Sequence, residues 1–370
     1  MKVILAAGGS GGHIFPSVAV ASELRKSNVE EIYFVSSKRQ LDRNILKASQ
    51  FSSFFLSINP MPLKFDPAKM ITFAFKLLAD VIKSLFIVLK VRPDVIAGFG
   101  GYSSGAIVLA GKICGVPLVI HEQNVLPGRA NKILAKIVDK VAISFKGSEE
   151  YFKSSSDKIF FTGNPLRLDM LSFEKERSYK ELNLDPDKFT VLVMGGSQGS
   201  SFLNRAASRA ALGAAKTFKD GVQFVHITGP KDVEEIKEFY RENNVKAAVF
   251  SFMERIDSAY AVSDLAVSRA GAAAVFELAH YARPMILVPY PNPKNNQRVN
   301  AAFFSEKGAA ILREEKDLEE DSLCAEMTDL IKDREKLGKM SSAAKKIAVP
   351  DAGKALAEMI IQLGQKKTDA

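Results

Sequence analysis

Short apolar runs alternate with longer amphipathic stretches along most of this chain of 370 residues. In the first half, the runs predict strands at residues 3–7, 32–35, 54–58, 95–97, 116–120 and 138–143. Because helix-compatible segments separate them, they predict a parallel, doubly wound sheet. Ligands of such sheets bind at the carboxyl ends of the strands, so the loops there are the first places to look for a site.

The second half repeats this alternation. Its apolar runs predict strands at residues 190–194, 223–227, 248–252, 265–267 and 285–288. A chain of this length divides naturally between two cores. We therefore expect an α/β protein of two Rossmann-like domains that face each other across a cleft, residues 1–163 and 164–350. The join should lie in the turn-rich stretch from 162 to 187, and a helix in residues 351–370 should return to the first domain.

Three segments of the first half follow predicted strands and carry glycine or polar residues. Residues 8–13 read Gly-Gly-Ser-Gly-Gly-His, and residues 98–105 are also rich in glycine. Glycine lets backbone N–H groups approach an anion, and a helix N-terminus favours negative charge, so both segments predict phosphate binding. The third segment begins His121-Glu122-Gln123-Asn124. Its side chains either form part of a site or cap the helix that starts near Arg129.

Comparable segments follow two strands of the second half. Residues 195–199 read Gly-Gly-Ser-Gln-Gly, and residues 268–271 read Ser-Arg-Ala-Gly before a run of alanines. The helix that starts there would direct N–H groups toward a diphosphate. Glu277 lies about two turns further on, and its carboxylate can accept hydrogen bonds from both hydroxyls of a ribose. The amides of residues 295–297 are suited to sugar hydroxyls.

The net charge of +9 lies in the first half. Residues 1–163 contain 21 Lys and Arg against 12 Asp and Glu, whereas the rest of the chain contains 30 of each kind. Such asymmetry favours binding to nucleic acid, to an anionic membrane or to an acidic ligand. Lysines recur every seven residues in the helix predicted at 67–91, at Lys69, Lys76, Lys83 and Lys90. This helix either rests on a membrane surface or presents an ordinary solvated face, and the sequence leaves both readings open.

Several other classes of protein are disfavoured. No uncharged apolar run approaches the ~20 residues of a membrane span, and the N-terminal run is too short for a signal peptide, so a cytosolic location is expected. The two cysteines and four histidines form no metal-binding spacing, and we expect neither a metal nor a cofactor. There is no P-loop motif, and residues 9–14 lack the third glycine of the dinucleotide pattern.

Seven motifs in order resemble one family. They are Gly8–His13, Gly98-Phe99-Gly100-Gly101-Tyr102, His121–Asn124, Gly163-Asn164-Pro165-Leu166-Arg167, Gly195–Gly199, Ser268-Arg269-Ala270-Gly271 and Asn296-Gln297. Together they resemble the MurG family of peptidoglycan N-acetylglucosaminyltransferases, in glycosyltransferase family 28. The resemblance implies a GT-B fold and inverting transfer from UDP-N-acetylglucosamine to the muramyl 4-hydroxyl of undecaprenyl-diphosphate-muramyl-pentapeptide (lipid I), which gives lipid II. It also implies peripheral attachment to the cytoplasmic face of the bacterial inner membrane, and leaves cell-wall synthesis proteins open as partners.

The resemblance assigns site residues by position. Contacts to the UDP-sugar are expected at Ser10, Gly11, Gly12, Asn124, Arg167, Ser197, Met253, Ala272, Ala273, Ala274, Val275, Phe276, Glu277 and Gln297. The acceptor diphosphate is expected at Gly11, Gly12, Gly100, Gly101 and Tyr102. His13 is the candidate general base, although it could instead bind the acceptor diphosphate or shape its loop. Ala270 and Phe276 stand where the family commonly has serine, so a hydroxyl contact is lost at each.

Two other functions fit part of the pattern. A UDP-N-acetylglucosamine 2-epimerase could share the architecture but would leave the basic first half without a purpose. A nucleic-acid-binding module would use the positive charge but not the glycine segments or the region around Gln297. Binding to liposomes and to duplex DNA at several salt concentrations would separate these readings.

Overall fold

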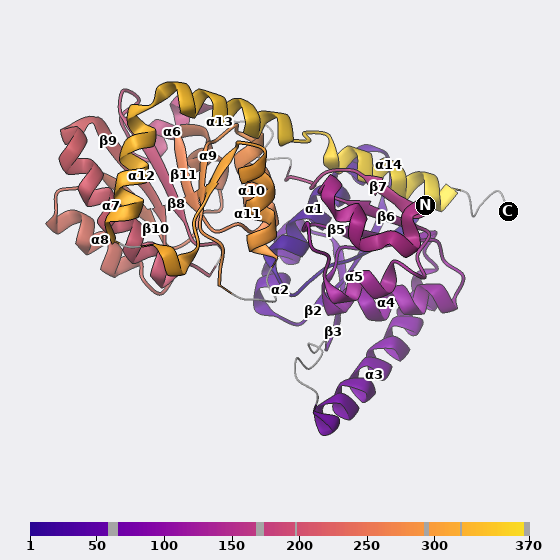
Figure 1. Cartoon of the computed structure of the whole chain (residues 1–370). Coiled ribbons are helices and arrows are strands. Elements are labelled where there is room, and N and C mark those ends of the chain that lie inside the picture. Colours follow the sequence, from indigo (N-terminus) through magenta and orange to yellow (C-terminus); the bar gives the residue numbers. More distant parts are fainter. Residues whose placement is uncertain (58–65, 168–173, 197, 292–295, 319, 366–370) are drawn as a thin grey trace. The chain divides into compact units, whose positions relative to one another are not determined.

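The chain forms two compact units in the computed structural model. The structure describes residues 1–57, 66–167, 174–196, 198–291, 296–318 and 320–365 (Figure 1). Unit 1 consists of Met1–Leu168 together with Val349–Ala370, and unit 2 consists of Asp169–Ala348. Each unit is described by itself below.

The sheet of unit 1 has seven parallel strands in the order β3-β2-β1-β4-β5-β6-β7. The strands are β1 (Lys2–Ala6), β2 (Glu31–Ser37), β3 (Ser52–Leu56), β4 (Val95–Gly98), β5 (Leu118–Glu122), β6 (Lys140–Ile143) and β7 (Ile159–Phe161). The order reverses beside β1, which pairs with β2 on one edge and β4 on the other. In sheets of this kind, ligands bind beyond the carboxyl ends of the strands at such a switch point.

Helices cover both faces of this sheet. They are α1 (Gly11–Lys26), α2 (Gln40–Ser49), α3 (Pro67–Val91), α4 (Gly101–Ile113), α5 (Arg129–Leu134) and α14 (Ala352–Gln365), with a 3₁₀ segment at Lys146–Lys158. One core packs α1 and α14 against the sheet, and another packs α3 and α4 against its opposite face. Leu356 and Ile360 of α14 are buried in the first of these cores with Val3 and Leu5. The C-terminal helix is therefore part of the interior of unit 1.

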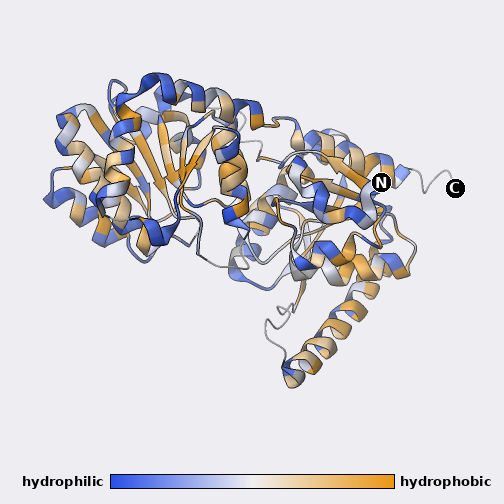
Figure 2. Cartoon of the chain, in the orientation of Figure 1, coloured by the Kyte–Doolittle hydropathy of each residue, from blue (hydrophilic) through white to orange (hydrophobic). Residues whose placement is uncertain are grey.

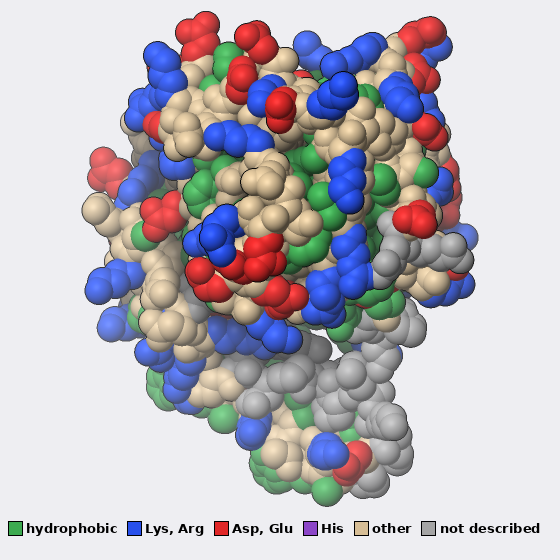
Figure 3. Space-filling model, turned by 90° about the vertical axis from the view of Figure 1, so that its left-hand side faces the viewer, with side chains coloured by type: hydrophobic (Ala, Val, Ile, Leu, Met, Phe, Trp, Pro, Cys, Tyr) green, Lys and Arg blue, Asp and Glu red, His purple; other side chains and the backbone are tan. Residues whose placement is uncertain are grey.

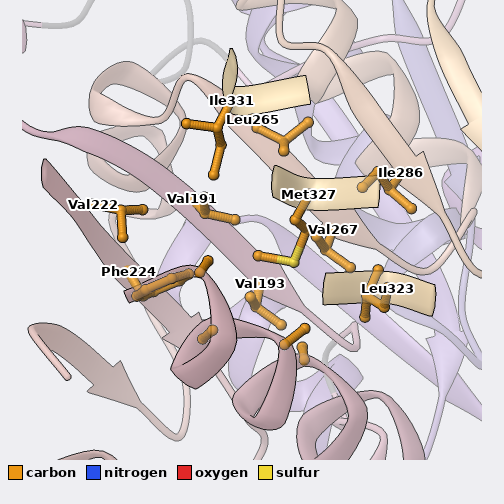
Figure 4. Packing of buried hydrophobic residues seen from close by; sticks show 14 of the residues in the cluster. Val191, Val193, Val222, Phe224, Leu265, Val267, Ile286, Leu323, Met327 and Ile331 are labelled. Carbon is orange, nitrogen blue, oxygen red and sulfur yellow. The ribbon is translucent and has the colours of Figure 1, made fainter. Parts of the chain in front are cut away.

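Unit 2 repeats the topology with six parallel strands in the order β10-β9-β8-β11-β12-β13. The strands are β8 (Phe189–Met194), β9 (Val222–Ile227), β10 (Ala247–Phe250), β11 (Leu265–Ser268), β12 (Met285–Leu287) and β13 (Ala310–Leu312). The helices are α6 (Lys175–Glu181), α7 (Ser201–Phe218), α8 (Val233–Glu242), α9 (Ile256–Val262), α10 (Ala272–His280), α11 (Gln297–Glu306), α12 (Glu320–Lys332) and α13 (Arg334–Ile347). Figure 4 shows Val191, Val193 and Val267 of the sheet packing against Leu323 and Met327 of α12.

Each predicted strand is observed with its ends within two residues of the prediction, although Ile58, the predicted end of the third strand, lies outside the described residues. Two short strands were missed. Residues 159–161 and 310–312 form three-residue strands at the edge of each sheet. An edge strand lacks a partner on one side, and Phe160 and Phe161 are each 40% exposed, so the buried apolar run that identifies a central strand is absent. Figure 2 shows the hydrophobic residues concentrated in the strands of both sheets. Within the described residues, no helix combines the length and apolar character needed to cross a bilayer.

Candidate active site

The first glycine loop joins β1 to α1 and is hydrogen-bonded to Asp42 and Arg39, just after the end of β2 at Ser37. The N–H of Gly9 donates to Oδ2 of Asp42 at 2.8 Å, and the hydroxyl of Ser37 donates to the same oxygen. The guanidinium of Arg39 donates to the carbonyl of Gly9 at 2.6 Å. Asp42 was not predicted from the sequence. Its position shortly after the second strand is close to that of the carboxylate that binds ribose in dinucleotide folds, but here it binds the loop itself.

His13 lies in the first turn of α1. Its Nδ1 is 3.2 Å from the carbonyl oxygen of Gly8 and 3.2 Å from the hydroxyl of Ser10. A carbonyl can only accept, so the bond to Gly8 assigns the hydrogen to Nδ1 and leaves the lone pair on Nε2. Burial lowers the pKa of His13 below its ordinary value of 6.5, against an opposing effect of the Gly8 carbonyl. The imidazole is therefore neutral at pH 7 and can accept a proton at Nε2.

The second glycine loop packs directly against the first. Gly101 has φ +77°, and a Cβ there would lie 2.5 Å from the carbonyl oxygen of Gly8. A Cβ at Gly100 would lie 3.2 Å from Nε2 of His13. Only glycine permits this approach. Gly100 and Gly101 thus lie beside the helix start that carries Gly11 and Gly12, and the four predicted acceptor glycines come together around His13. The side chain of Tyr102 is outside the described part of the structure.

The segment from His121 to Asn124 is mostly an internal support. His121, Glu122 and Gln123 are buried, and burial lowers the pKa of His121 to about 4. The carboxylate of Glu122 accepts hydrogen bonds from the backbone and side-chain nitrogens of Asn124, at 2.9 and 3.1 Å, and from the N–H of Gly128 at 3.1 Å. Gly128 is the N-cap residue of α5. The helix-capping alternative therefore describes Glu122, and Asn124 is the only partly exposed member of the four.

Arg167 lies in unit 1, although the sequence analysis placed it in the second domain. Its guanidinium is 5.1 Å from the centre of the Phe15 ring. A Cβ at Gly11 would lie 3.2 Å from that same ring, so Arg167 is near the start of α1. The segment before Arg167 also packs in unit 1. The hydroxyl of Ser144 donates to Oδ1 of Asn164, and Gly163 lies so close to Val349 that a Cβ there would meet its side chain. The boundary of the unit consequently follows Leu168.

The glycine loop of unit 2 joins β8 to α7. Gly199 has φ +74°, and a Cβ there would collide with the carbonyl oxygen of Thr228. Ser200 caps α7, because its hydroxyl accepts from the N–H of Leu203. Ser197, a predicted contact of the donor, lies outside the described residues.

Arg269 holds this loop, a role that the sequence analysis did not assign. Its Nη2 donates to Ser200 Oγ at 2.6 Å, and its Nη1 donates to Glu315 Oε2 and to the carbonyl of Val288, both at 3.0 Å. The side chain is buried and ties the loops after β8 and β12 to the segment after β13. The arginine of the Ser-Arg-Ala-Gly motif thus acts as a clamp within unit 2.

Helix α10 presents its N-terminus at the switch point of the unit 2 sheet, directly after β11. Its N-cap residue is Gly271, which adds no side chain in front of the first turn. Val275 and Phe276 are buried, and Phe276 packs edge-on against Phe304 with ring centres 5.8 Å apart. These two residues can reach a ligand through backbone atoms alone. The small side chains of the preceding residues, Ala272, Ala273 and Ala274, leave the approach to the helix open.

Glu277 is partly exposed and is bonded to an interior tyrosine. The hydroxyl of Tyr260, on α9, donates to Glu277 Oε2 at 2.7 Å. Two further predicted contacts lie at chain turns of the same unit. Met253 is partly exposed and follows β10, and Gln297 begins α11 and accepts from the N–H of Tyr290 at 3.0 Å. Asn295 is outside the described residues.

Among the residues that are described, no group of three His, Cys, Asp or Glu side chains is placed to hold a metal ion.

Comparison with known families matches both units. Residues 3–143 match the family model of the glycosyltransferase family 28 N-terminal domain, and residues 190–356 match that of its C-terminal domain. A protein of Desulfotalea psychrophila is 36% identical over 98% of this chain and 96% of its own length. A protein of Halothermothrix orenii is 33% identical over 97% of this chain and 98% of its own. Both are named UDP-N-acetylglucosamine–N-acetylmuramyl-(pentapeptide) pyrophosphoryl-undecaprenol N-acetylglucosamine transferase.

Solved structures give the same fold. The crystal structure of MurG from Acinetobacter baumannii superposes with a TM-score of 0.76 at 25% identity, covering 98% of this chain and all of the other. This places the chain in the GT-B architecture. A UDP-GlcNAc 2-epimerase from Neisseria meningitidis, bound to UDP-GlcNAc, superposes with a TM-score of 0.69 at 18% identity, over 98% of this chain and all of the epimerase. That likeness concerns the fold alone.

Proposed function

Because the chain belongs to glycosyltransferase family 28, we propose that it transfers N-acetylglucosamine from UDP-N-acetylglucosamine to the muramyl 4-hydroxyl of undecaprenyl-diphosphate-muramyl-pentapeptide, forming lipid II. The observation that carries the proposal is the arrangement around His13. Two glycine loops and a helix N-terminus surround a neutral imidazole at the switch point of the unit 1 sheet. An acceptor that is both a diphosphate and an alcohol requires this combination of anion-binding backbone and proton acceptor.

Unit 2 binds the donor in this proposal. The diphosphate of UDP lies at the start of α10, where backbone N–H groups and the helix dipole favour negative charge. Glu277, later on the same helix, accepts hydrogen bonds from the ribose hydroxyls. Ser197, Met253 and Gln297 complete the contacts to the nucleotide and the sugar, and Ser10, Gly11, Gly12, Asn124 and Arg167 are contributed by unit 1.

Unit 1 binds the acceptor and supplies the base. Gly11, Gly12, Gly100, Gly101 and Tyr102 hold the acceptor diphosphate through the backbone. Nε2 of His13 accepts the proton of the muramyl hydroxyl as its oxygen bonds to the anomeric carbon, on the face opposite UDP. The bond from that carbon to the diphosphate breaks, and UDP leaves with the electron pair, so the configuration inverts. The first-turn N–H groups of α10 and the charge of Arg167 stabilise the leaving diphosphate.

The test is a transfer assay with labelled UDP-N-acetylglucosamine and a lipid-diphosphate-muramyl-pentapeptide acceptor. We expect a labelled product that extracts with the lipid and carries the disaccharide. Label that appears as free UDP-N-acetylmannosamine in the absence of acceptor would instead support the epimerase reading. If neither product forms, both the transferase reading and the epimerase reading are contradicted.

We also propose that helix α3 attaches the protein to an anionic membrane surface, at the cytoplasmic face of the inner membrane. Six large apolar side chains on α3 are between 45% and 70% exposed. They are Ile71, Phe75, Leu78, Ile82, Phe86 and Leu89. Their spacing of three or four residues places all six on one face of a helix of 25 residues, about 37 Å long.

The other faces of α3 support this reading. Asp80, Ser84 and Val88 are buried against the rest of unit 1, and the carboxylate of Asp80 accepts a hydrogen bond from the N–H of Ser57. The four lysines spaced by seven residues lie beside the apolar face rather than on it. An exposed apolar stripe flanked by lysines is the arrangement of helices that lie in a membrane interface.

The face of the molecule drawn in Figure 3 is mixed in charge. On the face of the molecule in Figure 3, Lys and Arg side chains are interspersed with Asp and Glu. This mixing agrees with the equal numbers of basic and acidic residues after residue 163. The attraction to an anionic surface is therefore assigned to the first half of the chain.

A further inference from the structure

Tyr260 is a completely buried tyrosine whose hydroxyl reaches a carboxylate at the surface of unit 2. The side chain lies in α9, and its ring packs against that of Tyr281 with centres 5.5 Å apart. The hydroxyl is 2.7 Å from Glu277 Oε2 and 3.7 Å from Met194 Sδ. A carboxylate is much the stronger acceptor of the two, so the hydroxyl hydrogen is directed at Glu277.

This bond restricts the rotation of the Glu277 side chain. A glutamate has three side-chain torsions, and a partly exposed one ordinarily samples several rotamers. A donor held in the core limits Glu277 to the rotamers that keep Oε2 beside the hydroxyl of Tyr260. A carboxylate has about four acceptor positions, so the tyrosine bond is compatible with hydrogen bonds from two further hydroxyls.

The surroundings keep the tyrosine itself in place. Met194 is the last residue of β8, directly before the glycine loop, and Glu277 lies on α10. Ser263 donates to the carbonyl of Tyr260 at 3.1 Å, just beyond the end of α9. The hydroxyl of Tyr260 therefore contacts both the end of β8 and helix α10, the two parts of unit 2 that the proposed function places near the nucleotide.

We propose that Tyr260 is a positioning residue that orients Glu277 toward the ribose of the nucleotide, an inference that rests on the proposed function of Glu277. Tyr260 does not touch the nucleotide. Its effect is on the discrimination between a ribose and a sugar that lacks one of the two hydroxyls. If Tyr260 only filled the core, a phenylalanine in its place would keep the ring and leave this discrimination unchanged.

The experiment measures the dissociation constants of UDP and 2′-deoxy-UDP by calorimetry on the full-length chain. The variants are Tyr260→Phe, which removes only the hydroxyl, and Glu277→Ala, which removes the carboxylate. We expect the wild-type chain to prefer UDP, and Glu277→Ala to abolish the preference. We expect Tyr260→Phe to reduce the preference by about tenfold or to the level of Glu277→Ala, since a hydrogen bond that organises a charged acceptor is worth on the order of 1.4 kcal/mol.

Tyr240→Phe is the matched control. Tyr240 is buried in the same unit, and its hydroxyl is bonded to Nδ1 of His226 at 3.0 Å rather than to Glu277. This variant therefore loses a buried tyrosine hydroxyl without touching α10, and it should keep the wild-type preference for UDP. The same loss of preference in Tyr240→Phe would show general loosening of the unit and would overturn the proposal.

The measurements distinguish the assignment of Glu277 to the ribose from the positioning role of Tyr260. If Glu277→Ala leaves the preference unchanged, the assignment of Glu277 to ribose fails, and the positioning role fails with it. If Glu277→Ala abolishes the preference while Tyr260→Phe matches the wild type, only the positioning role is overturned. A reduced preference in both, with an unaffected Tyr240→Phe, supports it.

Discussion

The carboxylate of Asp42 accepts a hydrogen bond from the backbone N–H of Gly9 over 2.8 Å, and thereby occupies an amide of the first glycine loop. The amides left to bind an anion are accordingly those that follow, where α1 begins at Gly11 and Gly12. The loop is thus held by hydrogen bonds to Asp42 and Arg39, just after β2.

Replacing Asp42 should loosen this loop. Asp42→Ala leaves the Gly9 N–H and the Ser37 hydroxyl without their acceptor, which we expect to lower the free energy of unfolding by about 2 kcal/mol. Urea denaturation measures this, and transfer activity should fall with it. Asp187→Ala, at an exposed turn in unit 2, is the control and should change the free energy by less than about 0.5 kcal/mol. Equal stability of the two variants would contradict the role of Asp42.

His13→Ala should act on the chemical step. Loss of a general base typically lowers kcat by about 10²–10⁴-fold, and the KM for UDP-N-acetylglucosamine should change little, because His13 touches the acceptor hydroxyl in the proposed mechanism. Steady-state kinetics with both substrates varied gives the answer. An unchanged kcat would remove His13 from the mechanism, and a raised acceptor KM alone would assign it to diphosphate binding.

The pH dependence of kcat/KM should reflect the lowered pKa of His13. A base must be unprotonated in the free enzyme, and burial lowers the pKa of His13 below 6.5. Activity should therefore stay at its plateau as pH falls from 7 and decline only at a midpoint below pH 6.5. Rates measured across pH 4.5–8, at several concentrations of acceptor, locate this midpoint. A midpoint above 6.5 would assign the acid limb to another group.

Polar substitutions on α3 should release the protein from vesicles. Phe75→Ser with Phe86→Ser removes the two most exposed apolar side chains of the helix, at 70% and 69%. We expect sedimentation with phosphatidylglycerol vesicles to fall by about tenfold or more, since burying each side chain contributes roughly 1.5–3 kcal/mol. Added salt should weaken binding of the wild type by screening the lysines.

Phe252→Ser provides the comparison, because Phe252 is an exposed phenylalanine of unit 2, at 53%. It should leave vesicle binding unchanged. Dimers of the wild type in sedimentation equilibrium that dissociate in the α3 variant, with no vesicle binding by either, would identify a second copy of the chain as the occupant of this stripe.

Acid should destabilise unit 2 through His226. This residue is buried between Tyr240 and Asn204, and burial lowers its pKa to about 3. Below pH 6.5 the unfolded chain binds a proton at His226 that the folded chain does not, so stability is lost as pH falls from 6.5 toward 3. One such group costs about 1.6 kcal/mol between pH 6.5 and 5. The unfolding free energy of His226→Gln should therefore fall less over this interval, and identical slopes would contradict the assignment.

The sequence predicted the sheets well because each central strand is a continuous apolar run. Val191 to Met194 is buried on both faces, and the glycine run that follows it marks the end of the strand. The edge strands at residues 159–161 and 310–312 lack this signal, since one edge of each has no partner. The position of Arg167 in unit 1 depends on Phe15 and Val349, which are distant in sequence, and no local pattern contains that information.

The same distinction applies to the site. The glycines were predictable because a backbone that bends sharply after a strand requires them, and this requirement is local. Asp42 and Tyr260 were not predicted, and Arg269 was named in a motif without a role, because each acts through a contact across 17 or more residues. The sequence left Glu122 open as a residue of the site or of a helix cap, and in the structure its carboxylate supports Asn124 and Gly128.

The position of helix α14 in unit 1 determines the order in which the two units can fold during synthesis. The core that contains Val3 and Leu5 is completed by Leu356 and Ile360. A ribosome releases the N-terminal strands first, yet their interior stays open to water until α14 has been synthesised. The middle of the polypeptide, which is continuous in sequence, is free to fold earlier, so the half that emerges first becomes native last.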